Sequence, residues 1–94
     1  MNWLRTLWLF IFFKRDQRET AQKYLDNAES IQALQRRLQE SADKITDKKE
    51  RVRFIAEIDD KVNRLRHDRF LIEQELRVAR CTPEQLKRLR SKAK

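Results

Sequence analysis

Glycine is absent from this chain of 94 residues, and proline and cysteine each occur once, at Pro83 and Cys81. Glycine and proline are the residues that most strongly mark tight turns, so the chain lacks the usual signals of a protein built from strands and turns. The absence of glycine also excludes a glycine-rich phosphate-binding loop. A single cysteine cannot form a disulfide bond within the chain, so nothing indicates an oxidising compartment.

The residues that are present favour helices. Charged residues make up 40% of the chain and hydrophobic residues 39%, and many of them are good helix formers such as Leu, Arg, Lys, Glu, Gln and Ala. This composition and length predict one small all-α domain. Because a chain of this size buries only a modest core, we expect association with another molecule to contribute to its stability.

The net charge of +8 is concentrated at the two ends of the chain. Residues 1–18 contain four basic residues and one acidic residue, and residues 77–94 contain seven and one. Residues 19–76 are nearly balanced, with twelve basic and thirteen acidic residues. Basic ends favour contact with anions, whereas a balanced middle favours a packed body. The residues predicted to make anionic contacts are Lys14, Arg15, Arg18, Lys87, Arg88, Arg90 and Lys92.

The longest apolar run, WLRTLWLFIFF, occupies residues 3–13 and includes only two polar residues, Arg5 and Thr6. As an α-helix it would be about 16 Å long, which is about half of the apolar core of a bilayer. A helix that is apolar on every side needs cover from water. We therefore predict that residues 1–15 form an anchor or docking helix. Its docking residues are predicted to be Trp3, Leu4, Leu7, Trp8, Phe10, Ile11, Phe12 and Phe13.

Three surfaces could cover this helix: a membrane surface, an apolar groove of a partner, or the rest of the chain. We favour the membrane surface, because tryptophans near the start and a basic cluster after the end are typical of an interfacial helix. A spanning helix is a further alternative, and it requires a thinned bilayer and snorkelling of Lys14 and Arg15. A cleaved secretory signal is disfavoured because the charges follow the apolar run and no small-residue cleavage site is present.

Residues 16–80 are predicted to form an amphipathic helical body. Apolar residues recur every three or four positions through residues 16–45 and again through residues 48–80, which is the period of a helix with one apolar stripe. This stripe either joins two helices of the same chain or, as a coiled-coil seam, captures a partner or a second copy. The predicted helix-interface residues are Leu25, Ile31, Leu34, Leu38, Ile45, Val52, Ile55, Ile58, Val62, Leu65, Ile72 and Leu76, and Arg69 interrupts the series.

The two halves of the body meet at the most polar stretch, residues 41–53. Asp47, followed three residues later by Glu50, fits the start of a helix. The spacing of Val52, Ile55 and Ile58 also shifts the heptad phase at this point. We therefore favour a hairpin of two antiparallel helices, with one continuous helix of about 96 Å as the alternative.

Residues 81–94 are predicted to form a short basic helix. Thr82 is a good N-cap, Pro83 suits the first helical position, and Gln85 completes a T-x-x-Q capping box. The helix is either a solvated charged tail or a contact for an acidic protein, a lipid surface or nucleic acid. No aromatic residue follows Phe70, so this end has no platform on which bases could stack, and nucleic acid is the less favoured partner.

Candidate reactive residues are few. His67 shares a predicted helical face with Asp60 and Asn63, but a single histidine among arginines is a poor metal site. Arg80 and a following helix N-terminus are expected to lower the thiol pKa of Cys81, although a plain structural role is favoured for it. No nucleophile occurs in a pattern with a base and a group to orient that base. We therefore expect no enzyme activity, no metal, no cofactor and no small-molecule substrate.

The sequence thus predicts a small non-enzymatic helical adaptor or accessory subunit. It is anchored by residues 1–15 to a membrane surface or a partner groove, and residues 16–80 bind another protein or a second copy. It is expected to be membrane-associated and to face a reducing compartment, either the cytoplasm or an organelle interior, with a soluble cytoplasmic protein as the alternative. The rival interpretations are a basic nucleic-acid-binding or regulatory module and a small protein inhibitor of a larger enzyme.

Overall fold

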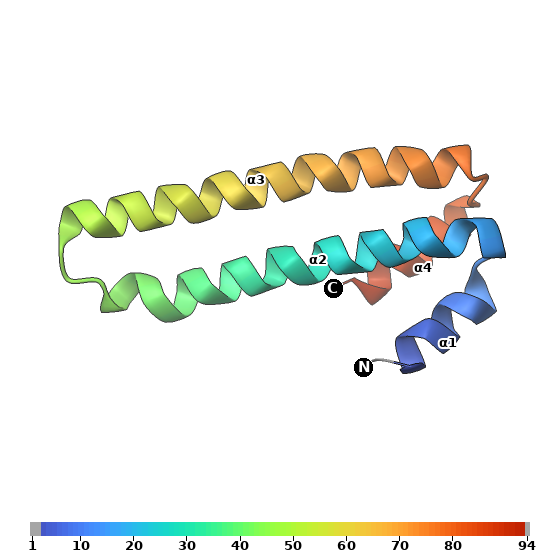
Figure 1. Cartoon of the computed structure of the whole chain (residues 1–94), viewed down its shortest axis with the longest axis horizontal. Coiled ribbons are helices and arrows are strands. Elements are labelled where there is room, and N and C mark those ends of the chain that lie inside the picture. Colours follow the sequence, from blue (N-terminus) through green and yellow to red (C-terminus); the bar gives the residue numbers. More distant parts are fainter. Residues whose placement is uncertain (1–2, 94) are drawn as a thin grey trace.

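The computed structural model describes residues 3–93, and it is all-α as the composition predicts. Within these described residues, four α-helices follow one another (Figure 1). They are α1 (Trp3–Phe12), α2 (Arg15–Ser41), α3 (Lys48–Val78) and α4 (Pro83–Lys92), and a single 3₁₀ turn, η1 (Ala42–Lys44), follows α2. Three of these α-helices fall within the segments predicted to be helical, and α2 begins at Arg15, one residue before the predicted start of the body at residue 16.

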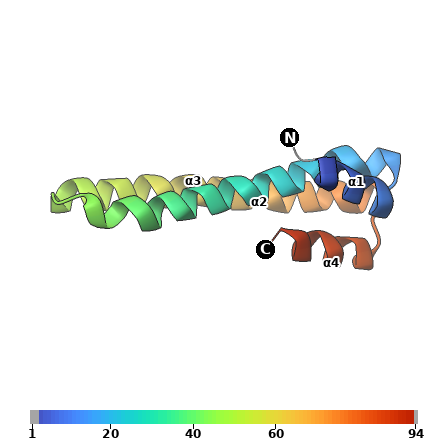
Figure 2. The ribbon, with the colours of Figure 1, turned by 90° about the horizontal axis from the view of Figure 1, so that it is seen from below.

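The two long helices, α2 and α3, form an antiparallel hairpin (Figure 1). The prediction of a hairpin is therefore confirmed, and the alternative of one continuous helix is wrong. Both short helices, α1 and α4, pack at the open end of the hairpin, on different sides of it (Figures 1 and 2). We call this four-helix end the head, and the two-helix remainder, residues 33–64, the arm. The described molecule is elongated, with extents of 50 × 26 × 18 Å.

The turn between α2 and α3 forms without glycine. The 3₁₀ turn η1 follows α2 directly. After it, Ile45 and Asp47 adopt extended backbone conformations that any residue can reach. The Asp47 carboxylate accepts a hydrogen bond of 3.1 Å from the backbone N–H of Lys49, so it caps α3 as its N-cap residue. Arg51 donates through Nε to the carbonyl of Ile45 at 3.1 Å, which closes the turn from the other side.

The turn between α3 and α4 depends on a residue with positive φ. Arg80 has a φ of 62°, the left-handed region that glycine usually occupies after a helix. Its N–H donates to the carbonyl of Arg77, and the N–H of Cys81 donates to that of Leu76 at 3.1 Å, which is the hydrogen-bond pattern of a Schellman motif. The capping box predicted after it is confirmed, because Thr82 Oγ1 accepts from the N–H of Gln85 at 3.1 Å.

The apolar interior is divided into two clusters along the hairpin. The head cluster joins all four helices, and its buried members are Leu9, Phe13, Ala21, Tyr24, Leu25, Leu76, Leu86 and Leu89. The arm cluster joins only α2 and α3, and its buried members are Ile58 and Val62 in the arm and Ile31 just before it. The head therefore contains most of the core, and the arm is stabilised mainly by one narrow seam.

A polar layer lies between the two clusters and explains why Arg69 interrupts the apolar stripe. Asn27 is buried, and its Nδ2 donates to the carbonyl of Leu65 at 2.8 Å. Its Oδ1 accepts from Arg69 Nε at 3.2 Å, and the Arg69 guanidinium lies over the ring of Tyr24. Buried polar pairs of this kind specify the register of paired helices, because a slipped register would leave them unsatisfied.

Most of the predicted helix-interface residues lie in the seam between α2 and α3. Those that are buried or half-buried are Leu25, Ile31, Leu34, Leu38, Ile45, Ile55, Ile58, Val62, Leu65, Ile72 and Leu76. Val52 is a correction, because it is 60% exposed and the helical rotation of α3 turns it away from α2. Since the seam is used within the chain, the buried part of the stripe is not free to capture a partner helix.

Candidate functional site

α1 has two faces, which lie on opposite sides of the helix. Leu9 and Phe13 are buried in the head cluster, and Trp8 and Phe12 pack against it half-buried. The other side, which we call the outer face of α1, is exposed by between 45% and 68% per residue. It consists of Trp3, Leu4, Leu7, Phe10 and Ile11. Of the three predicted covers, the chain's own core therefore covers only one side of this helix.

The predicted docking residues are thus divided between the two faces. The sequence prediction did not include Leu9, although Leu9 is the most buried residue of α1. An apolar stripe is recognised by contrast with polar neighbours, and this segment has too little contrast for its inner side to stand out. Arg5 is the one weak indication in the sequence that the side of α1 with Leu9 differs from the other side, because this polar residue lies one helical turn before Leu9.

Ion pairs hold α1 against α2. Arg5 Nη2 lies 3.0 Å from Asp26 Oδ1, and Arg5 Nη1 lies 3.4 Å from Glu29 Oε2. The Arg5 side chain is mostly buried by these contacts, which makes the pairs stronger than a fully solvated pair. At the other end of α1, Arg18 donates through Nε to the carbonyl of Phe13 at 3.1 Å. These contacts place α1 on the head with its outer face directed away from the hairpin.

Two glutamines join the ends of all four helices. Gln17 donates through Nε2 to the carbonyl of Ala79 after α3, and its Oε1 accepts from the N–H of Lys14 before α2. Gln85 donates through Nε2 to the carbonyl of Phe12 in α1, and its Oε1 accepts from the N–H of Thr82 before α4. The two side chains are also hydrogen-bonded to each other at 3.1 Å.

The glutamine junction, Gln17 with Gln85, satisfies one backbone group at each of these four helix ends, which would otherwise be short of partners. Gln17 is almost completely buried there. The capping box revealed Gln85 in the sequence, but Gln17 had no such signal. Lysine at position 14 is not a typical N-cap residue, so the pattern K-x-x-Q does not stand out.

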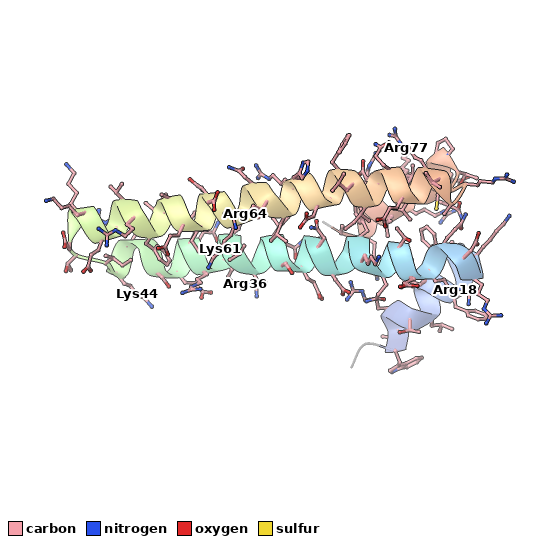
Figure 3. All side chains as sticks on the ribbon, turned by 45° about the horizontal axis from the view of Figure 1, so that its top comes forward. Arg18, Arg36, Lys44, Lys61, Arg64 and Arg77 are labelled. Carbon is pink, nitrogen blue, oxygen red and sulfur yellow. The ribbon has the colours of Figure 1, made fainter. Side chains whose placement is uncertain are left out.

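Basic side chains surround α1 on both sides. The Arg18 guanidinium lies 4.1 Å from the centre of the Phe10 ring, at the junction of α1 and α2 (Figure 3). On the α4 side, the Arg88 guanidinium lies 4.6 Å from the centre of the Phe12 ring, and Lys92 Nζ lies 5.6 Å from that of Trp8. The fold thus brings the two basic ends of the sequence to one end of the molecule.

The predicted anionic contacts therefore all lie on the head, but they are not equally available. Lys14, Arg15 and Lys87 are exposed. Arg90 forms an ion pair of 3.2 Å with Glu73, which raises the pKa of its guanidinium. Arg88 forms an ion pair of 3.3 Å with Glu84 within α4. By contrast, the labelled residues Arg36, Lys61 and Arg64 lie along the arm, away from α1 (Figure 3).

An open groove separates α1 from the outer side of α4. We call it the α4 groove, and its lining residues are Trp8, Pro83, Glu84, Lys87, Arg88, Ser91 and Lys92. Three of these residues are cationic, and the single carboxylate, Glu84, is paired with Arg88. The groove therefore has an aromatic side, formed by Trp8, and a basic side, formed by α4.

The two candidate reactive residues do not form a site. His67 is exposed on α3, and no group of three or more potential metal ligands occurs among the described residues. Cys81 is half-buried, and its pKa is raised, first by burial and then by the nearby Asp16 carboxylate. The expectation of a lowered thiol pKa is therefore wrong, because burial and the Asp16 carboxylate both disfavour the thiolate.

Cys81 is consequently expected to react slowly with alkylating reagents. A raised pKa leaves less thiolate at neutral pH, and the thiolate is the form that iodoacetamide alkylates. The midpoint, which is the pH at which the alkylation rate reaches half of its maximum, should therefore be higher for Cys81 than for a short peptide of the same local sequence. Asp16→Asn should lower the midpoint part of the way, because it removes one of the two causes. A native midpoint below that of the peptide would contradict this prediction.

Within residues 3–93, no helix is both long enough and apolar enough to cross a membrane, α1 included. Comparisons of the chain with protein-family models, with curated proteins and with solved structures find no match.

Proposed function

We propose that this protein is a small non-enzymatic helical adaptor that docks on a membrane surface through the outer face of α1. The head holds this face in position, and the arm extends from the head as a rod on which other proteins could bind. The proposal agrees with the exposure of α1 and with the elongated shape of the described chain.

The main observation in support of this proposal is the exposure of the outer face of α1. Its five residues form one continuous arc of a 10-residue helix, and all of them are large and apolar. Burying their exposed surface would contribute on the order of 5–10 kcal/mol before the cost of association. Soluble proteins do not usually leave a patch of this kind in water unless it is an interaction site.

The surroundings of α1 favour a membrane as the occupant of this face. An interfacial helix inserts its apolar side between the lipids and places basic residues at the level of the headgroups. Arg18 lies at one edge of the outer face, Lys14 and Arg15 follow the end of α1, and the basic side of α4 lies at the other edge. Tryptophan at position 3 is also typical of the membrane–water boundary.

Vesicle flotation tests this proposal. The intact protein should float with phosphatidylcholine vesicles, and Leu7→Asp with Phe10→Asp should weaken binding at least about 100-fold, because two apolar contacts are replaced by charges. A matched control is available on α3, where Phe70 and Leu71 are 57% and 47% exposed, compared with 62% and 45% for Phe10 and Leu7. Phe70→Asp with Leu71→Asp should leave flotation unchanged. Equal flotation of both double variants and the wild type would contradict the proposal.

A partner groove is the second candidate for the same face, and one observation favours it. Trp3, Leu7 and Phe10 follow the i, i+4, i+7 spacing of helices that dock into an apolar groove of another protein, and they line one shallow surface hollow. In that case the wild type should not float with vesicles. It should instead bind a protein partner in a pull-down, and the double variant on α1, but not the control on α3, should lose that partner.

A further inference from the structure

We propose that the α4 groove is a binding site for the anionic headgroup of a phospholipid, and that α1 and α4 together select negatively charged membranes. This inference rests on the membrane docking proposed above and adds the lipid class and the residues that recognise it. It assigns a role to the basic helix α4 that the outer face of α1 does not explain.

The charges of the groove are complementary to a phosphate group. Lys87, Arg88 and Lys92 project from one side of α4, with the Ser91 hydroxyl between them as a further donor. Glu84 is the single carboxylate in the lining, and its charge is offset by the ion pair with Arg88. The remaining charge is that of two lysines, whose ammonium groups are common ligands of phosphate oxygens.

The groove is open, so it offers room for an external group. Among its lining residues, Lys92 Nζ lies over the Trp8 ring. Arg88 also lines the groove, and its guanidinium lies over the ring of Phe12, which is not a lining residue. The Lys92 ammonium has three N–H donors, and those that point away from the ring can bind an anion. If α1 docks as proposed above, the half-buried indole of Trp8 would lie beside the lipid headgroups, the level of a bilayer at which tryptophan is enriched.

The position of the groove connects it to the outer face of α1. Trp8 lies one helical turn after Leu4 and three residues before Ile11, so all three are neighbours on the surface of α1. A phospholipid whose phosphate sits in the groove would therefore place its acyl chains beside Leu4 and Ile11. This juxtaposition of a basic groove and an apolar face matches the two chemically different parts of a lipid and argues against a purely polar ligand.

The test compares two charge reversals in the full chain. Lys87→Glu with Lys92→Glu changes the groove, and Lys48→Glu with Lys49→Glu makes the same charge change at the tip of the arm, where both lysines are exposed. Binding is measured on phosphatidylcholine vesicles with and without phosphatidylglycerol. The groove variant should lose about 30-fold in affinity for the anionic vesicles, since each basic residue near the surface contributes about fivefold. The tip variant should lose much less.

The fluorescence of Trp8 provides a second measurement of the binding of anionic vesicles at the α4 groove. In a Trp3→Phe background, the fluorescence of the chain comes from Trp8, since Trp3 and Trp8 are its two tryptophans. Its emission should shift to shorter wavelength with anionic vesicles, and the groove variant should reduce this shift while retaining its helical circular dichroism.

The outcomes separate this inference from the proposed function. Equal binding to both kinds of vesicle, or equal losses in the two charge reversals, would overturn the groove as a lipid site and leave docking by α1 intact. Binding to anionic vesicles that depends on the lysines but not on Leu7 and Phe10 would support the groove and overturn docking by α1. No vesicle binding overturns both. Binding of duplex DNA that requires the same lysines, without preference for anionic vesicles, would assign the groove to nucleic acid instead and overturn the inference.

Discussion

Gln17→Leu is expected to destabilise the protein by about 3 kcal/mol. The substitution keeps the size of the side chain but removes the hydrogen bonds to Ala79, Lys14 and Gln85. A buried polar group that loses its partner costs about 1–3 kcal/mol, and three groups lose one here, although the movement of water into the junction would offset part of the cost. For a domain with a total stability of about 5–15 kcal/mol this is a large fraction.

Urea unfolding followed by circular dichroism measures this effect, and Gln35→Leu is the matched control. Gln35 is exposed on the same helix, so the same substitution there should change the free energy of unfolding by less than about 0.5 kcal/mol. A Gln17→Leu variant that is as stable as this control would show that the glutamine junction does not contribute to stability. The junction also helps to fix the orientation of α1, because Gln85 donates a hydrogen bond to the carbonyl of Phe12.

Leu76→Ala is expected to destabilise the protein by about 3–5 kcal/mol. Leu76 has no exposed surface and lies in the head cluster with residues of the other three helices. Its carbonyl also accepts the hydrogen bond from Cys81 that ends α3. Removing its side chain leaves a cavity where neighbouring helices meet, and two short helices that depend on tertiary contacts would lose part of their support.

The matched control for this truncation is Leu71→Ala in the same helix. Leu71 is 47% exposed, so the same loss of atoms leaves no enclosed cavity and should cost under about 1 kcal/mol. Thermal unfolding followed by circular dichroism distinguishes the two variants. A Leu76→Ala variant that melts together with Leu71→Ala would contradict the assignment of the head as the stable part of the molecule.

Gln17 and Leu76 both lie in the head, where the ends of four helices are assembled. The arm is stabilised by a seam between two helices, whereas the head combines a four-helix core with a polar junction and ion pairs to α1. Both proposed contacts with lipid, the outer face of α1 and the α4 groove, lie on the head. The surface that needs a fixed geometry is therefore placed on the most extensively packed part of the chain.

Much of the secondary structure followed from the sequence alone. The period of three and four residues predicts α2 and α3, and the box at Thr82, Pro83 and Gln85 predicts the start of α4, because these are local properties of one segment. The hairpin turn was predicted with an alternative left open. No glycine or proline breaks the chain at residues 41–53, and the turn forms through extended residues and the Asp47 cap.

The division of α1 into two faces was decided only by the tertiary structure. A segment in which nearly every residue is apolar carries no local information about which side is covered, so Leu9 and the outer face could not be separated in advance. Likewise, Gln17 and Arg69 are polar residues whose partners lie more than 40 positions away in the chain. The two basic ends of the chain also lie near one another only because tertiary packing brings α1 and α4 to the same end of the hairpin. Composition and periodicity determined that helices form, whereas long-range packing determined which of their faces remain exposed for binding.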